Sequence, residues 1–216
     1  MTATIGSQMF SLDMPTNGGV SICLIGASRA GKTTLLKHIY REYFKNHISV
    51  MFSMNDQAQI YRDLPRRLMI CPDYVPTIIG DMYKMNNKCN NKFDFLVITD
   101  DCVGHKIKND DQITKALTIY RNTAISTIAS FQGRVLMNAV GRANCNFICI
   151  FKQNTPKEIK NVIEEYLDNY LPLEATMAEK IQYFMEATRN FQFFVIDTIQ
   201  GKCYLTKLSP EQAGLN

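Results

Sequence analysis

The segment from residue 26 to residue 33 combines residue types that bind phosphate. It reads Gly-Ala-Ser-Arg-Ala-Gly-Lys-Thr and fits G-x-x-x-x-G-K-[ST], the Walker A pattern. Glycines let the backbone curl until successive N–H groups point at phosphate oxygens, and a following helix adds its positive end. Lys32 would reach the β- and γ-phosphates of ATP, and the Thr33 hydroxyl would bind Mg2+. The residues expected to bind ATP are Gly26, Ala27, Ser28, Arg29, Ala30, Gly31, Lys32, Thr33 and Thr34.

Two carboxylates follow an apolar run at residues 95–99. A second buried strand that ends in acid is the Walker B pattern, and such an acid holds the metal of a nucleotide-hydrolysing site. We expect Asp100 to hold Mg2+ through water. Asp101 would orient the attacking water and take its proton.

A polar amide, Gln132, ends the next apolar run at residues 126–131. In many P-loop ATPases this strand is inserted between the phosphate-loop strand and the acidic strand, so its tip lies beside the γ-phosphate. In kinases and GTPases the phosphate-loop strand and the acidic strand are direct neighbours, and no such residue is required. We therefore predict the inserted strand order, with Gln132 as a catalytic residue that holds the water or senses the γ-phosphate.

Short apolar runs alternate with helix-length segments, which is typical of βαβ units around a mainly parallel sheet. The sequence predicts an α/β fold: a RecA-like P-loop NTPase in three layers, with a C-terminal hairpin. Residues 1–216 would form one ATPase domain, with an extended segment at 1–17, a frayed helix end and exposed asparagine-rich loop at 81–93 and a flexible tail at 207–216. Predicted strands are 20–25, 49–53, 68–70, 95–99, 126–131, 146–151, 193–197 and 202–206; predicted helices are 32–44, 78–88, 110–122, 156–170 and 174–188.

The composition is that of a globular protein. At 46% hydrophobic and 20% charged residues it excludes collagen, coiled coil and a disordered chain. The net charge of +4 is compatible with a polyanionic partner but does not require one. No basic-then-apolar leader and no apolar stretch of about 18 residues is present, so we expect a soluble, non-secreted protein without membrane insertion. The seven cysteines form no C-x-x-C pair, and the three histidines lack ligand spacing.

Together these residues resemble the genome-packaging ATPases of membrane-containing double-stranded DNA viruses, within the FtsK–HerA superfamily. The viruses that encode these ATPases include poxviruses, other large DNA viruses, virophages and tailless icosahedral phages. Besides the phosphate loop and the acidic pair, the likeness includes Tyr120-Arg121-Asn122 and Gly141-Arg142-Ala143-Asn144. It covers residues 18–155. Asp101 stands where bacterial relatives usually have Glu, residues 133–135 lack their Arg-Pro, and residues from 158 onward carry no family signal.

The resemblance implies an ATP-hydrolysing motor that packages double-stranded viral DNA into a capsid. It implies a homo-oligomeric ring, a pentamer or hexamer, acting at the portal vertex of the capsid. The location would be the viral assembly site in the host cell cytoplasm, or the virion. In this superfamily the ATP site lies between subunits, and an arginine of the neighbour stabilises the transferring phosphoryl group. Arg121 and Arg142 are both candidates for this arginine finger, and the sequence leaves the choice open.

Three basic segments are candidates for DNA contact, because a translocating ring needs Lys or Arg facing the phosphates of the duplex. They are residues 105–109, residues 84–92, and the group Arg62, Arg66 and Arg67.

Two other functions fit the phosphate loop. A nucleoside or nucleotide kinase would have this length, but no arginine-rich lid is evident in the sequence. A nucleotide-gated interaction module would bind ATP and hydrolyse it poorly. Three measurements distinguish the motor, the kinase and the interaction module. DNA should stimulate hydrolysis by the motor, and nucleosides should stimulate the kinase. Single-turnover hydrolysis by the assembled protein separates the module from both.

Overall fold

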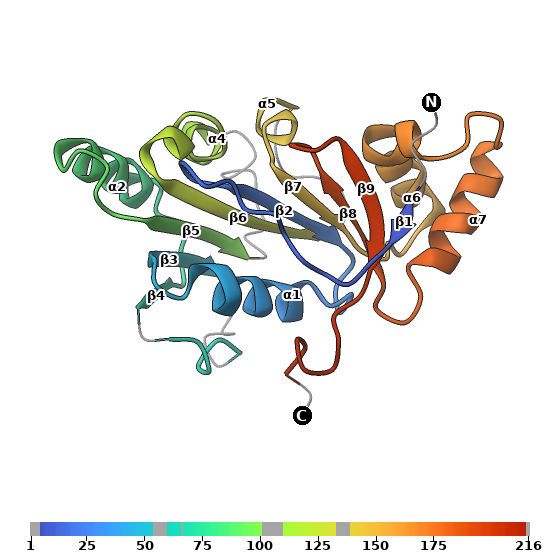
Figure 1. Cartoon of the computed structure of the whole chain (residues 1–216), viewed down its shortest axis with the longest axis horizontal. Coiled ribbons are helices and arrows are strands. Elements are labelled where there is room, and N and C mark those ends of the chain that lie inside the picture. The colour runs from blue at the N-terminus through green and yellow to red at the C-terminus, as the bar shows by residue number, and fades with distance from the viewer. Residues whose placement is uncertain (1–4, 54–59, 66, 101–109, 133–138, 215–216) are drawn as a thin grey trace.

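The computed structural model describes residues 5–53, 60–65, 67–100, 110–132 and 139–214. Within these residues nine strands form one sheet, in the order β1-β9-β8-β7-β2-β6-β5-β3-β4 (Figure 1). The strands are β1 (Gly6–Ser7), β2 (Ser21–Gly26), β3 (Ile48–Ser53), β4 (Leu68–Cys71), β5 (Phe95–Asp100), β6 (Ile125–Gln132), β7 (Phe147–Ile150), β8 (Phe193–Asp197) and β9 (Lys202–Thr206).

The centre of the sheet is parallel, and one side of it is antiparallel. Strand β2 pairs in parallel with β6 and β7, and β6, β5, β3 and β4 continue the parallel order. Strands β7, β8 and β9 are antiparallel neighbours, so the predicted C-terminal hairpin is confirmed. Strand β6 lies between β2 and β5, which confirms the predicted inserted order.

Helices cover both faces of the sheet and make the three predicted layers. Figure 1 shows α1 below the sheet, and α2, α4 and α5 above it. The α-helices are α1 (Lys32–Ile39), α2 (Pro76–Lys88), α4 (Asp111–Thr118), α5 (Ala139–Ala143), α6 (Pro156–Val162) and α7 (Met177–Ala187). Short π- and 3-10 segments extend them: η1 (Tyr40–Phe44), η3 (Tyr120–Thr123), η4 (Ile163–Leu167) and η5 (Asp168–Tyr170).

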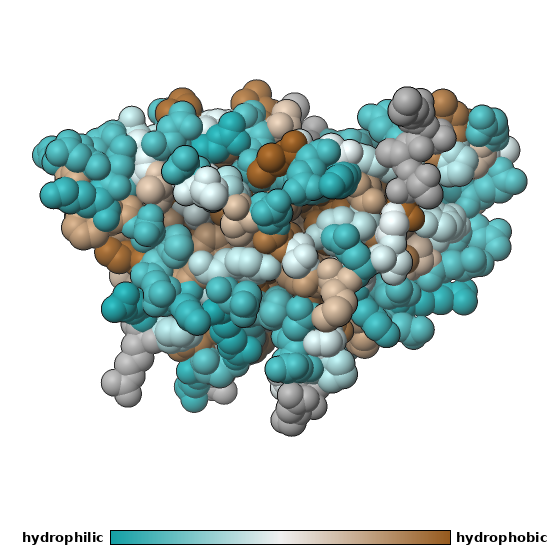
Figure 2. Space-filling model, viewed as in Figure 1, coloured by the Kyte–Doolittle hydropathy of each residue, from teal (hydrophilic) through white to brown (hydrophobic). Residues whose placement is uncertain are grey.

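Two apolar cores lie on the two faces of the sheet. Ile22 and Leu24 of β2 pack in the core that contains Leu35 of α1. Cys23 and Ile25, which alternate with them, pack in the core shared with α2, α4, α6 and α7. Because the central strands are buried on both faces, their sequences read as continuous apolar runs. Hydrophilic residues cover much of the surface of the molecule that Figure 2 shows.

Three features differ from the sequence predictions or were missed by them. The short elements β1 and α5 were not predicted. The segment 81–93 was expected to be a frayed helix end and an exposed loop; Asn86 lies in a helix, as predicted, but the expected exposure is wrong there, because its side chain is fully buried in α2. The Asn86 amide donates to the carbonyl oxygens of Phe93 and Thr123 at 2.9 and 2.5 Å, so it pairs backbone groups that burial removes from water. In the part of the chain that is described, no helix is both long and apolar enough to cross a membrane.

Candidate functional site

The loop between β2 and α1 has the backbone conformation of an anion cradle. The residues Arg29 and Gly31 take positive φ values of 61° and 102°. Such alternation of right- and left-handed residues turns successive N–H groups toward one point, and α1 adds its N-terminal end there. The Ala27 N–H donates to the Lys152 carbonyl at 2.9 Å, which ties the loop to the end of β7.

The first glycine of the loop is required by a close approach. A Cβ atom at Gly26 would lie 2.5 Å from the Cβ of Phe151. The Phe151 ring is buried and stacks on Phe193, with ring centroids 4.6 Å apart. The loop therefore rests on a packed aromatic pair, and only a residue without a side chain fits at position 26.

Lys32 is buried, with 5% of its surface exposed. Its ammonium donates to the carbonyl oxygens of Gly26 and Ala27 at 2.9 and 2.8 Å. The ammonium that the sequence predicts to reach the β- and γ-phosphates thus contacts backbone carbonyls of its own loop in this structure. The reason is that the two carbonyls at the end of β2 offer the charged group acceptors within reach, and a buried ammonium needs such partners. To contact a phosphate, the Lys32 ammonium must exchange these carbonyls for phosphate oxygens.

Asp100 ends β5 and is buried, with 1% of its surface exposed. In the strand pairing it lies opposite Ser53 of β3 on one side and Ser130 of β6 on the other. Residues paired across neighbouring strands project to the same face of the sheet. The alternation that places Leu24 and Ile98 in the α1 core therefore places this carboxylate and the two hydroxyls on the α1 side.

A tyrosine that the sequence analysis missed contacts this carboxylate. The Tyr61 hydroxyl donates to Asp100 Oδ2, and the tyrosine is as buried as its partner. The Lys37 ammonium lies 5.9 Å from the centroid of the Tyr61 ring. No motif marks Tyr61, because it lies 39 residues from Asp100 and the contact depends on packing.

The surroundings of Asp100 fit a hydrated Mg2+ ion. Among the described residues, the hydroxyls of Ser53 and Ser130 are buried and have no hydrogen-bond partner. Buried hydroxyls are normally paired, so their position beside a carboxylate points to a site that takes up water. Mg2+ binds oxygen ligands and keeps several of its waters. Thr33, in the first turn of α1, is the predicted direct ligand, and Asp100 is the predicted outer carboxylate.

Gln132 is the last residue of β6 and is exposed. It pairs in register with Gly26, the first residue of the phosphate loop. By the two-residue period of the strand it shares the face of Ser130. The structure thus brings Lys32, Asp100 and Gln132 to the same edge and the same face of the sheet. The predicted base, Asp101, lies outside the described residues.

Solved structures share this architecture. The DNA-packaging ATPase B204 of Sulfolobus turreted icosahedral virus superposes with a TM-score of 0.65 at 17% identity, over 90% of this chain and 100% of that chain. The genome-packaging NTPase B204 of Sulfolobus turreted icosahedral virus 2, in complex with sulfate, gives 0.64 at 17% identity, over 89% and 98%. The pCW3 conjugation coupling protein TcpA gives 0.67 at 14% identity, over 98% of this chain and 67% of that one.

The chain has the fold of the packaging ATPases. The resemblance that the sequence predicts is therefore confirmed at the level of the fold. No protein-family model and no curated protein sequence matches the chain. Within the packaging-ATPase fold, the phosphate loop and the strand tips described above lie at the carboxyl edge of the parallel strands, where ligands bind in open α/β sheets.

Arg121 lies at the other end of the packaging-ATPase fold. It belongs to η3, which precedes β6, so it is at the amino edge of the strands. Its guanidinium donates to the Asn144 carbonyl at 3.3 Å. Arg121 therefore does not lie beside the phosphate loop of its own chain, and its action on a neighbour stays a prediction. Arg142 belongs to α5, and its side chain lies outside the described residues.

The basic segments predicted to meet DNA are partly described. Residues 105–109 and Arg66 lie outside the described residues. Lys84 on α2 is exposed and pairs with Asp81 at 3.2 Å. Arg62 is exposed, and Arg67 donates to the Asn46 carbonyl at 3.3 Å. Their contact with a duplex stays a prediction.

Proposed function

We propose that this protein is an ATP-hydrolysing motor that moves double-stranded DNA and packages a viral genome into a capsid. The observation that carries the proposal is the register of β6: Gln132 lies opposite Gly26, on the strand between the phosphate loop and Asp100. This order fits a site that positions water against a terminal phosphate. The shared fold of the packaging ATPase B204 and the coupling protein TcpA supports the choice of DNA as the cargo.

In this proposal the residues have the roles that the sequence predicts for them. Loop N–H groups bind the phosphates of ATP, and the Lys32 ammonium leaves its two carbonyl acceptors for phosphate oxygens. Thr33 and Asp100 hold Mg2+, which neutralises phosphate charge when bound. Gln132 orients the attacking water through its amide, and Asp101 accepts the proton of that water.

The active form in this proposal is a ring of five or six copies. An arginine finger must approach the γ-phosphate, and Arg121 lies at the opposite edge of the sheet from the loop of its own chain. A neighbour in the ring would present Arg121 or Arg142 to that loop. The ring would act at the portal vertex of a capsid, at a viral assembly site in the host cell cytoplasm or in the virion. Its Lys and Arg side chains would follow the duplex backbone without reading bases.

The strand order does not favour the kinase alternative, in which the phosphate-loop strand and the acidic strand are direct neighbours. Here β6 separates them. A nucleotide-gated interaction module would also use an amide that senses the γ-phosphate, and single-turnover hydrolysis by the assembled protein distinguishes it from the motor.

The test is the rate of ATP hydrolysis with and without linear double-stranded DNA, at two protein concentrations. We expect DNA to stimulate the rate, and the rate per protein chain to rise with concentration as rings assemble. Stimulation by nucleosides instead of DNA, or a rate per chain that is independent of both, contradicts the proposal. Gln132→Glu is a conservative variant that keeps the side-chain length; we expect it to bind ATP and to hydrolyse it slowly.

A further inference from the structure

A strained turn joins α7 to β8. Its two central residues, Asn190 and Phe191, have φ values of 54° and 60°, and the Gln192 N–H donates to the Arg189 carbonyl at 3.0 Å. Two successive left-handed residues make a type I′ turn, which favours Asn at the first position and Gly at the second. Asn190 fits this preference, but Phe191 does not, because a bulky side chain disfavours the left-handed region.

Packing does not explain the phenylalanine either. Phe191 exposes 71% of its surface, whereas the neighbouring Phe193 is buried. A large apolar side chain in contact with water, held on a backbone that disfavours it, gains nothing for the core. Strain of this kind concentrates at functional sites, where the surrounding structure holds it in place.

The exposed ring lies at the phosphate loop. A Cβ atom at Gly31 would be 3.7 Å from Cδ1 of Phe191 and 3.8 Å from Cε1 of the buried Phe151. Gly31 directly precedes Lys32 and caps the N-terminus of α1. The Phe191 ring is thus beside the loop that we propose to bind the phosphates, although it is 160 positions further along the chain.

The topology sets the direction in which a bound nucleotide extends. Asp100 and Gln132, the groups for the metal and the terminal phosphate, lie on β5 and β6. The other neighbour of β2 is β7, followed by β8, and the turn that carries Phe191 leads into β8. A nucleotide whose terminal phosphate lies on the β6 side and whose nucleoside end points away from it would have that end on the β7 and β8 side, where Phe191 lies.

We propose that Phe191 is the platform on which the base of the bound nucleoside triphosphate stacks. The flat face of a purine and the face of a phenyl ring attract by stacking, and every base has such a face. The proposal rests on the proposed function in two respects: the phosphate loop binds a nucleoside triphosphate, and Asp100 and Gln132 lie beside its metal and terminal phosphate. It assigns a base-binding role to a residue that lies outside every motif of the sequence.

The first test compares ATP with inorganic tripolyphosphate, which has the phosphates and lacks the base. We expect Phe191→Ala to weaken ATP binding about tenfold, in the range measured for loss of a base–aromatic stack, and to leave the affinity for tripolyphosphate unchanged. Phe191→Tyr, which keeps the ring, should retain the affinity for ATP. The proposal is overturned if Phe191→Ala weakens the binding of ATP and of tripolyphosphate equally, or if it leaves the affinity for ATP unchanged.

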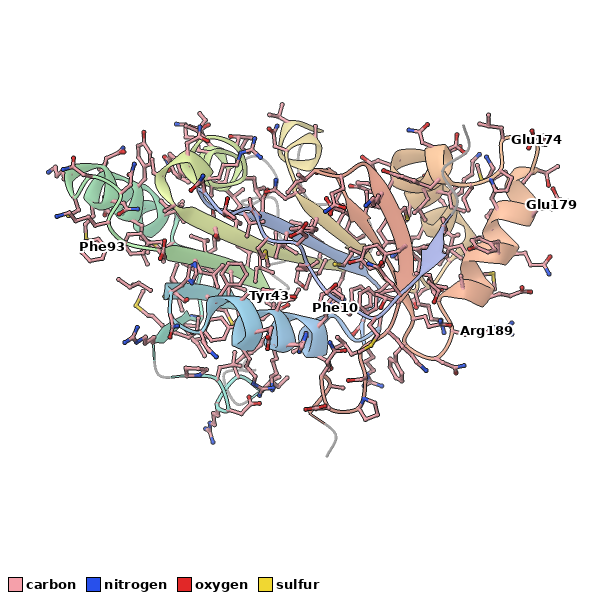
Figure 3. The ribbon with its side chains drawn as sticks, viewed as in Figure 1. Phe10, Tyr43, Phe93, Glu174, Glu179 and Arg189 are labelled. Carbon is pink, nitrogen blue, oxygen red and sulfur yellow. The ribbon has the colours of Figure 1, made fainter. Side chains whose placement is uncertain are left out.

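The second test uses fluorescence, because the chain contains no tryptophan. In Phe191→Trp the new indole is the only one, and ATP should quench or shift its emission while tripolyphosphate should not. The matched control is Leu173→Trp, since Leu173 is 72% exposed and follows η5 at the other end of α7. Figure 3 shows the neighbouring Glu174 at that far end and Arg189 at the end near the turn.

The two proposals fail in different ways. If the wild-type protein binds neither ATP nor tripolyphosphate, the proposed function and the base platform both fail. If it binds both, but Phe191→Ala does not discriminate between them and the indole at position 191 does not respond to ATP, the base platform alone fails. A response of the Leu173→Trp control to ATP equal to that at position 191 also overturns the platform.

Discussion

The hydroxyl of Tyr61 donates a hydrogen bond to the carboxylate of Asp100, and both side chains are almost completely buried. Strand β5 fixes the backbone of Asp100, whereas Tyr61 comes from the segment between β3 and β4. The carboxylate is thus oriented by a part of the chain that carries no nucleotide motif. Outer partners of this kind fix the direction in which a metal-binding group points.

We predict that Tyr61→Phe raises the Mg2+ concentration needed for half-maximal ATP hydrolysis about tenfold, as loss of an outer-shell partner usually does. The maximal rate at saturating Mg2+ should stay near that of the wild type, because the carboxylate itself remains. The control is Tyr204→Phe, which removes another buried hydroxyl that donates to the Ser11 carbonyl at 2.7 Å. Superimposable Mg2+ titrations for wild type and Tyr61→Phe would show that the hydrogen bond has no role in metal binding.

Substitutions of the adjacent acids Asp100 and Asp101 should affect different steps of ATP hydrolysis. Asp100→Asn removes the negative charge that holds the metal, so Mg2+-dependent hydrolysis should be lost. Asp101→Asn should bind Mg2+ and ATP normally and hydrolyse ATP at least about a hundredfold more slowly, since a general base contributes about 10²–10⁴-fold. Nucleotide titrations and single-turnover rates measure the two effects. An equal loss of ATP affinity in both variants contradicts this division of roles.

Gly26→Ala should destabilise the protein. Its Cβ would lie 2.5 Å from the Phe151 Cβ, and overpacking of this kind costs about 1–3 kcal/mol. For a chain of this length 1 kcal/mol corresponds to about 2–4 °C in Tm, so a fall of several degrees is expected in a thermal melt. The matched control is Gly6→Ala, where an added Cβ meets nothing within 4 Å. An unchanged Tm for Gly26→Ala would show that the loop moves away from Phe151 at no cost.

Most of the architecture could be predicted from the sequence because burial on both faces leaves continuous apolar runs. The runs at residues 20–25, 95–99 and 126–131 correspond to β2, β5 and β6, with boundaries within one or two residues. The place of β6 between β2 and β5 was also predicted, from the strand order that many P-loop ATPases share. The strand β1 was missed because Gly6 and Ser7 are exposed and pair with β9 through the backbone alone.

The missed site residues share a physical cause. Tyr61 and Phe191 reach the site through tertiary packing, and neither stands in a motif or in a periodic pattern. Asn86 was misplaced because a polar side chain in an asparagine-rich stretch suggests solvent. Its amide instead satisfies backbone groups at the start of β5 and at the end of η3. The buried position of Lys32 depends on carbonyl acceptors that sequence alone does not display.

A shared active site predicts complementation between two inactive variants. If Arg121 acts on the neighbour's ATP, Arg121→Ala should bind ATP and fail to hydrolyse it, and mixing it with Lys32→Ala should restore part of the rate. Some mixed interfaces then join an intact phosphate loop to an intact arginine. The same mixture made with Arg142→Ala identifies which arginine is the finger. If neither mixture recovers activity although the subunits exchange, the arginine acts within its own chain or has no catalytic role.

The measurement that tests the central claim most directly is displacement of a third DNA strand from a triplex at the end of a linear duplex. A motor that travels along the duplex removes the third strand, whereas an enzyme that hydrolyses ATP without moving leaves it bound. We predict ATP-dependent displacement by the wild-type protein, which takes longer as the duplex between loading site and triplex is lengthened. The variant Lys32→Ala, which should keep the fold and lose hydrolysis, should displace nothing. DNA-stimulated ATP hydrolysis without any displacement would contradict the account.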